Sequence, residues 1–331
     1  MGAVAIVPGM RDAGPVTDPF LARLAVHGQA LQQREPTGPP SLERAEPPPA
    51  PVHSNQLAFW QSQVARAAIN RRITGDPSLA PEVYFAAAHG LAVPAPHVLS
   101  LRGGDARLEV ALVEVGSCKR VTGLDTDERR VESANRSVPE ALRVQIGFRL
   151  GTLMEWDSSE QVGAVLARNV LHRQIDLEGT LDRVRASIVP GGLIFVDDFV
   201  GPARFQWTEA QLDAINRLLA CLPDELLTDL TAADGRRKRA VSRPSPDEFA
   251  ASNPHDAVRS DEILGCLDER FERVEVRLHG GALYHQLFTR IMGNFAGRPE
   301  LVRMVMEVDA MLTDSGVLSS DYVWGVWRRP I

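Results

Sequence analysis

Short apolar runs alternate with longer amphipathic stretches through the middle of the chain. The apolar runs occupy residues 98–101, 121–124, 144–150, 162–167 and 193–196. Between them, apolar residues recur at helical spacing in residues 106–115, 127–137 and 177–188. Strands without polar alternation are typical of a sheet that is covered on both faces. The alternation therefore predicts an α/β fold, a mainly parallel sheet with helices on both sides.

The residues before this region have a different pattern. Proline dominates residues 35–51 and favours extended backbone without regular hydrogen bonds. We therefore expect residues 1–54 to form a disordered arm with one short helix near 20–33. Helical spacing predicts a helix at 55–72, ended by Gly75-Asp76-Pro77, and a second helix at 81–89. Residues 55–95 are accordingly expected to form a helical cap.

The residues after Val200 complete the predicted sheet. Helices are expected at 209–221 and 261–270, and two late strands at 274–278 and 322–327, with helical residues 281–315 between the strands. This pattern predicts one main domain at 96–331 with helical insertions at 208–270 and 281–316.

Composition and charge exclude several classes of function. The chain has 331 residues, 44% hydrophobic and 24% charged, with a formal net charge of -7. A negative net charge gives no support to binding nucleic acid or an anionic membrane. No apolar run approaches the ~20 residues of a membrane span, and the first ten residues do not resemble a signal peptide. Cysteines are few and far apart, which fits a reducing compartment, so we expect a cytoplasmic protein.

A glycine-containing turn follows the first predicted strand. It reads Leu101-Arg102-Gly103-Gly104-Asp105-Ala106, and the second strand ends in Gly123-Leu124-Asp125. Such a turn lets a cofactor approach the backbone, and the acid can accept hydrogen bonds from ribose hydroxyls. These two features alone fit a nicotinamide enzyme equally well.

Two downstream segments favour another family. The run from Ser187 to Asp198 (SIVPGGLIFVDD) resembles the LxPGGxLxxxD run of class I (Rossmann-like) S-adenosylmethionine-dependent methyltransferases. Residues 167–172 (ARNVLH) resemble the fourth strand of that family. Segments 69–77, 199–207, 257–263 and 293–295 are similar to bacterial members associated with glycan modification and natural-product biosynthesis. The resemblance implies a mainly parallel seven-stranded sheet with a terminal antiparallel hairpin, and S-adenosyl-L-methionine as the cofactor.

The resemblance also implies a set of cofactor contacts. They are Arg102, Gly103, Gly104, Asp125, Thr152 and Asn169. Arg102 and Ala106 stand where the family usually has glycine, which leaves two opposite interpretations of Arg102. Its side chain either obstructs the methionine end of the cofactor or clamps the cofactor carboxylate with a bidentate fork.

Candidate catalytic residues follow the fourth and fifth strands. His172 and Asp198 are placed where an acceptor would meet the methyl group, and either can serve as a general base. A helix cap for His172, and hydrogen bonds from Asp198 to loop amides, are the alternatives. Asp197 shares this position. No metal site is predicted.

Candidate substrate contacts lie in the expected helical insertions. They are Arg204, Trp207, Tyr284 and His285. Arginine binds anions and tryptophan stacks on sugar faces, whereas a staple before the helix at 209–221 and simple packing are the structural alternatives.

The favoured interpretation is therefore a methyltransferase that methylates a hydroxyl of a small-molecule or glycan acceptor. The alternative is a pseudoenzyme, a scaffold or a different reaction on the same fold, because the cofactor loop is altered. A nicotinamide oxidoreductase is disfavoured by the PGG run and the late strand pair. Oligomeric state is left open, with a homodimer as one option.

The proline-rich arm gives the first testable prediction. Limited proteolysis is expected to remove residues 1–54 and leave the remainder folded, because the arm offers little apolar surface to bury. Mass spectrometry of the fragment and circular dichroism of the remainder check this. An arm that resists cleavage would instead pack on the domain or on a partner.

Overall fold

One sheet organises the part of the chain that the computed structural model describes, residues 58–102, 104–157 and 159–331. Its strands lie in the order β3-β2-β1-β4-β5-β7-β6. Their bounds are β1 His97–Leu101, β2 Arg120–Asp125, β3 Ile146–Leu150, β4 Val162–Arg168, β5 Ile188–Phe199, β6 Glu272–Leu278 and β7 Tyr322–Arg328. The expected arm at 1–54 lies outside the described residues.

Strand β7 is the one described strand that runs against the others. It pairs antiparallel with both β5 and β6, so that Phe195 opposes Val326, while β1 to β5 pair in parallel. The two late strands therefore form the expected terminal antiparallel pair, with β7 inserted beside β5. The predicted fold class, a Rossmann-like class I methyltransferase sheet, is confirmed.

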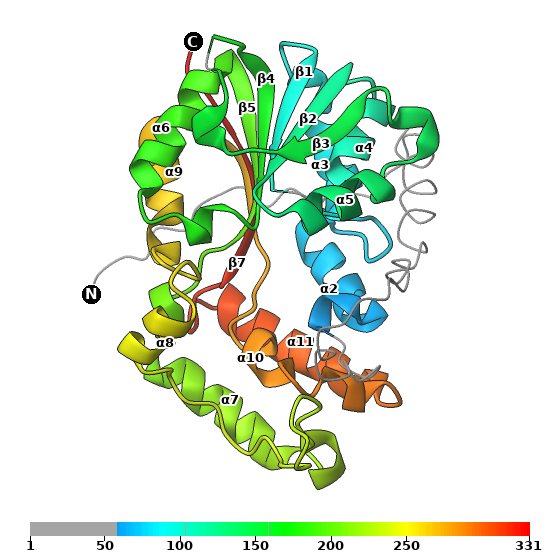
Figure 1. Ribbon diagram of the computed structural model, residues 1–331. Coiled ribbons are helices and arrows are strands. Elements are labelled where there is room, and N and C mark those ends of the chain that lie inside the picture. The colour runs from blue at the N-terminus through cyan, green and yellow to red at the C-terminus, as the bar shows by residue number, and fades with distance from the viewer. Residues whose placement is uncertain (1–57, 103, 158) are drawn as a thin grey trace, which may run out of the picture.

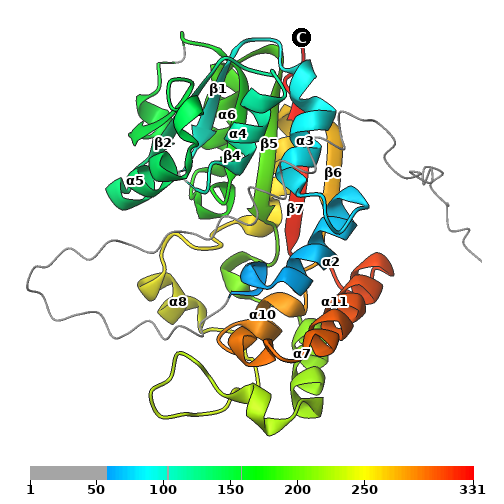
Figure 2. The same ribbon diagram turned by 90° about the vertical axis from the view of Figure 1, so that its right-hand side faces the viewer.

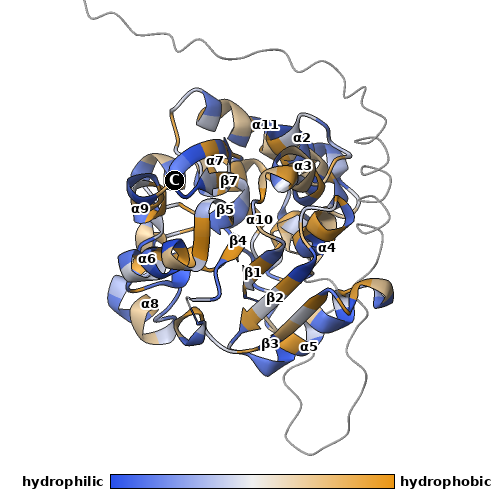
Figure 3. Ribbon diagram, turned by 90° about the horizontal axis from the view of Figure 1, so that it is seen from above, coloured by the Kyte–Doolittle hydropathy of each residue, from blue (hydrophilic) through white to orange (hydrophobic). Residues whose placement is uncertain are grey.

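Helices cover both faces of the sheet (Figure 1). One face packs against α3 (Pro81–His89), α4 (Arg107–Glu114) and α5 (Glu128–Ser137), and the other against α6 (Leu177–Ser187) and α9 (Ile263–Arg270). Successive residues of a strand point to opposite faces, so Leu166 and Phe195 join the first core while Val165 and Val196 join the second. Figure 3 shows the resulting concentration of hydrophobic residues along β1, β4 and β5.

A separate helical layer lies beyond the carboxyl ends of the parallel strands (Figures 1 and 2). It contains α2 (Gln63–Thr74), α7 (Glu209–Cys221), α8 (Pro246–Ser252), α10 (Tyr284–Phe288) and α11 (Pro299–Asp314). Apolar residues of η1 (Phe59–Gln61), α7, α10 and α11 form a third core inside this layer. No helix among the described residues has the length and apolar character needed to cross a membrane. The layer covers the carboxyl ends of the parallel strands, where ligands bind in open α/β folds.

Local signals in the sequence set the helix ends. Gly75 ends α2 with φ 84°, a left-handed conformation that glycine adopts without a steric penalty. Pro81 begins α3, and the Asp127 carboxylate accepts from the amides of Arg129 and Arg130 at the start of α5. The helix expected at 55–72 is shorter than predicted, because η1 precedes it and α2 begins only at Gln63.

Packing at the centre of the sheet gives a stability prediction. Leu166 on β4 has no exposed surface, so Leu166→Ala should lower the free energy of unfolding by about 2–5 kcal/mol. Chemical denaturation measures the change. Leu91→Ala is the matched control, because Leu91 is 77% exposed and surface substitutions stay within about 0.5 kcal/mol. Equal effects for the two variants would contradict the packing described.

Candidate active site

Left-handed backbone at residues other than glycine gathers at the carboxyl ends of the strands. The residues with positive φ there are Arg102 (70°), Ala106 (57°), Asn169 (53°), Arg204 (52°), Phe205 (54°) and Ala257 (45°). Each such residue costs roughly 1–2 kcal/mol, and strained backbone of this kind concentrates at functional sites. The rim of the sheet is therefore the candidate active site.

Arg102 connects two strand ends across this rim. Its amide donates to the Leu124 carbonyl at 2.7 Å, and its Nη1 donates to the Asn169 carbonyl at 2.9 Å. Burial lowers the pKa of Arg102, and the nearby Arg173 lowers it further. The guanidinium thus crosses from the end of β1 to the loop after β4. Gly103 lies outside the described residues, and Gly104 is exposed.

Asp125 ends β2, as expected, but its carboxylate is already engaged. Arg130 grips it through Nη2–Oδ1 at 2.7 Å and Nε–Oδ2 at 2.9 Å, and the Asp127 amide donates to Oδ1 at 2.9 Å. Only 4% of Asp125 is exposed. A ribose hydroxyl that binds the Asp125 carboxylate would have to replace hydrogen bonds from Arg130.

The other two expected cofactor contacts have structural roles of their own. The Thr152 amide and hydroxyl both donate to Glu155, which caps the short helix that follows β3. Asn169 is exposed, its amide donates to the Asp197 carbonyl at 2.8 Å, and its carbonyl accepts from Arg102. Asn169 therefore lies beside Arg102 on the rim.

His172 lies between two carboxylates. Its Nδ1 is 2.5 Å from Asp198 Oδ1, and its Nε2 is 3.3 Å from Asp256 Oδ1. Asp198 also accepts from the amides of Val170, Leu171 and Phe199. Asp198 thus holds the turn after β4 against the end of β5, which is the alternative role that the sequence allowed for it.

These contacts determine the charge of the imidazole. Burial alone would lower the pKa of His172, but the hydrogen bonds to Asp198 and Asp256 raise it to about 9. The ring is therefore protonated at neutral pH and donates hydrogen bonds instead of accepting a proton. The expectation that His172 acts as a general base does not fit this arrangement.

Arg168 forms a second network that the sequence did not reveal. Its guanidinium lies 3.2–3.3 Å from carboxylate oxygens of Glu82, Asp105 and Asp197, and 5.4 Å from the centre of the Trp324 ring. Burial raises the pKa of Asp197 to about 7, although Arg168 opposes this rise. Asp197 is thus an ion-pair partner of Arg168 on the opposite face of β5 from Asp198.

The expected substrate contacts are less accessible than predicted. Tyr284 is fully buried and Trp207 is 4% exposed, stacked on Phe205, so neither offers a free surface to a sugar. Arg204 Nη1 donates to the carbonyls of residues 253, 254 and 256, which fixes the loop that carries Asp256. His285 is partly buried among aromatic rings.

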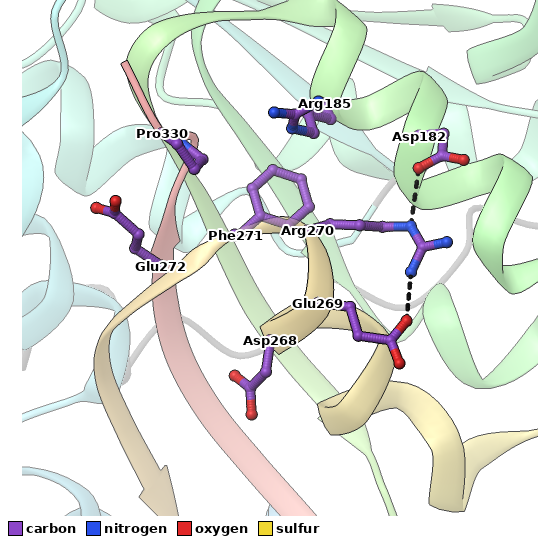
Figure 4. A pocket seen from close by; sticks show the side chains of 8 residues that line it. All are labelled: Asp182, Arg185, Asp268, Glu269, Arg270, Phe271, Glu272 and Pro330. Carbon is purple, nitrogen blue, oxygen red and sulfur yellow. Dashed lines mark hydrogen bonds and ion pairs between the residues drawn. The ribbon is translucent and has the colours of Figure 1, made fainter.

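A surface pocket of about 360 Å³ lies at the opposite end of the sheet, beside the start of β6 (Figure 4). Three of its charged groups are paired, since Arg270 contacts Asp182 at 2.8 Å and Glu269 at 3.1 Å. Parallel α/β sheets bind ligands at the carboxyl ends of their strands, so this pocket is no part of the candidate active site.

Comparisons with known proteins agree with the fold and go no further. No protein-family model and no curated protein matches the chain. A methyltransferase structure from Mesorhizobium loti is 17% identical, with 72% of this chain and 93% of that chain covered and a TM-score of 0.41. Geranyl diphosphate methyltransferase with sinefungin is 16% identical over 79% of this chain and 81% of that chain, with a TM-score of 0.43. The [4+2]-cyclase SpnF is 12% identical over 76% and 82%, with a TM-score of 0.44. At these scores the fold assignment depends on the strand order described above.

The charge of His172 is testable through pH. Because its pKa is raised on folding, the stabilisation is complete below the unfolded pKa of ~6.5 and is lost as pH rises towards 9. Within that window the free energy of unfolding should fall by up to about 1.4 kcal/mol per pH unit from this group. Denaturation of wild type and His172→Gln at several pH values measures it. An unchanged slope in His172→Gln would refute the assignment.

Proposed function

We propose that the protein binds S-adenosylmethionine at the carboxyl ends of β1, β2 and β4 and transfers its methyl group to a hydroxyl of a small-molecule or glycan acceptor. The observation that carries the proposal is the backbone of the turn after β1. Arg102 and Ala106 keep the left-handed conformation of glycine although neither is glycine. A sequence that had no use for this turn would lose the strain by adopting ordinary dihedral angles.

The residues around the turn fit an adenosyl cofactor in part. Asp125 supplies a carboxylate at the tip of β2, where a ribose would be held. Gly104 leaves its surroundings open, since a Cβ there would meet nothing within 4 Å. Arg102, Asn169 and Thr152 complete the proposed contacts. The cofactor would have to replace two internal contacts, Arg130 on Asp125 and Arg102 on the Asn169 carbonyl.

The bound cofactor would supply a methyl group activated by a sulfonium. Methyl transfer then depends mainly on positioning, because the acceptor must approach in line with the bond that breaks. The charged His172 can donate a hydrogen bond to the acceptor if Asp256 moves away from its Nε2. Natural-product or glycan modification in the cytoplasm is the proposed setting.

A second candidate is favoured by the same two arginines. Arg102 and Arg130 satisfy groups that a cofactor would otherwise bind, and a protein that had lost the reaction would keep such internal contacts. In this alternative the fold serves as a scaffold or carries a different reaction.

Arg102→Gly separates the two candidates. If the side chain obstructs the cofactor, the substitution removes the obstruction and relieves the strain at φ 70°, so affinity for S-adenosylmethionine should rise about tenfold or more. If it clamps the cofactor carboxylate, affinity should fall about tenfold, as a charge-assisted hydrogen bond is lost. Calorimetric titration of both proteins gives the sign.

Arg107→Gly is unsuitable as a control, because Arg107 lies in α4 and glycine destabilises a helix. The control is Arg129→Ala, which changes an exposed arginine on α5. It should leave the affinity unchanged. Wild type and Arg102→Gly that both fail to bind at millimolar cofactor would refute the proposed function.

A further inference from the structure

An aromatic cluster surrounds His285 where the helical layer meets the end of β5. We use this name for Phe59, Phe199, Phe205, Trp207 and Tyr322, whose rings all lie near the imidazole. The centroid distances run from 5.5 Å for Tyr322 to 6.5 Å for Trp207. These rings come from η1, β5, the loop after β5, and β7. The cluster is thus built by segments far apart in the sequence.

The cluster adjoins the candidate active site. Phe199 is the last residue of β5, and its ring lies 6.5 Å from that of His172 and 5.8 Å from that of His285. Asp256, which contacts His172, also acts electrostatically on His285. A ligand among the rings would therefore reach the rim of the sheet.

Two histidines in this region each have a buried ring nitrogen without a hydrogen-bond partner within the described part of the chain, as does the Trp207 indole. The histidine atoms are His285 Nδ1 and His279 Nε2, and the His279 ring stacks on Tyr322 at 5.5 Å. A buried polar atom without a partner costs roughly 1–3 kcal/mol. Such atoms are rare in folded proteins and indicate a missing partner.

The helix that carries His285 is fixed at both ends. The Asp309 carboxylate accepts from the amides of Leu283 at 2.7 Å and Gly281 at 3.2 Å. At the other end, Lys238 Nζ donates to the carbonyls of Gln286 and Thr289. The imidazole is therefore held in position beside the rings, although none of the described residues bonds to its Nδ1.

His285 differs from His172 in its charge. Burial and, to a smaller extent, the nearby Lys238 together lower the pKa of His285 to about 4, against a smaller opposing effect of Asp256. The ring is neutral at neutral pH, so its unprotonated nitrogen can accept a hydrogen bond. A phenol, with a pKa of ~10, is a stronger hydrogen-bond donor to this nitrogen than an aliphatic alcohol is.

We propose that the aromatic cluster, at its partly exposed members Phe205 and Tyr322, binds a planar aromatic ligand that carries a hydroxyl group. An imidazole nitrogen of His285 accepts the hydrogen bond of that hydroxyl. This inference rests on the proposed function, in which the ligand is the methyl acceptor. As the hydroxyl oxygen bonds to the methyl carbon, the carbon–sulfur bond breaks with its electron pair left on sulfur. The hydroxyl proton passes to His285.

The test compares phenol with anisole, which has the same ring but no hydroxyl proton. Wild type should bind phenol about fivefold or more tighter than anisole, as expected for one hydrogen bond to a buried acceptor. His285→Phe should bind both probes with equal affinity, since the ring remains and the acceptor is lost. Affinities are measured by ligand-observed nuclear magnetic resonance.

His255→Phe is the matched control, because His255 is exposed and lies outside the cluster. It should keep the preference for phenol. Thermal melting checks that each variant is folded, and His285→Asn replaces His285→Phe if the latter is not. No binding of phenol at millimolar concentration, or a preference that survives both His285 substitutions, would overturn the inference.

Titration with S-adenosylmethionine on the same samples separates this inference from the proposed function. A His285-dependent preference for phenol without cofactor binding leaves the ligand site and removes the methyltransferase. Cofactor binding without any preference for phenol does the reverse. The two hypotheses therefore fail independently.

Discussion

The ion pairs of the Arg168 guanidinium are the interaction on which the rim of the sheet depends. Arg168 ends β4, the strand between β1 and β5, and joins carboxylates from α3, the β1 turn and β5. Without it, the pKa of Asp197 would rise further, because Arg168 opposes the effect of burial on that carboxyl. The network also ties Asp105, in the strained turn after β1, to the end of β4.

The pleat of β5 divides its two terminal acids between separate networks. Successive strand residues point to opposite faces, so Asp197 meets Arg168 while Asp198 meets His172 and three amides. In the sequence, Asp197 and Asp198 are adjacent acids that cannot be told apart as candidates. Their functions differ only because of the direction of each side chain, and this direction depends on strand register.

Much of the fold was predictable because its signals are local. Apolar runs, Gly75 and Pro81 specify where elements begin and end, and the α3 and α7 bounds agree with the predicted 81–89 and 209–221. The site was less predictable because its contacts join distant residues. Arg102 meets Asn169 across 67 positions, and Arg168 meets Glu82 across 86. Even the short-range Arg130–Asp125 fork depends on the angle between β2 and α5, which no periodicity reports.

The two histidines beside Phe199 show how the surroundings assign chemistry to identical side chains. His172 has a carboxylate at each ring nitrogen, which stabilises the imidazolium and raises its pKa to about 9. His285 has aromatic rings around it and a lysine nearby, which stabilise the neutral ring and lower its pKa to about 4. At pH values between these two pKa values, the His172 ring donates hydrogen bonds and the His285 ring can accept one. A proton donor and a proton acceptor beside the same phenyl ring are the arrangement from which acid–base chemistry at neutral pH can be built.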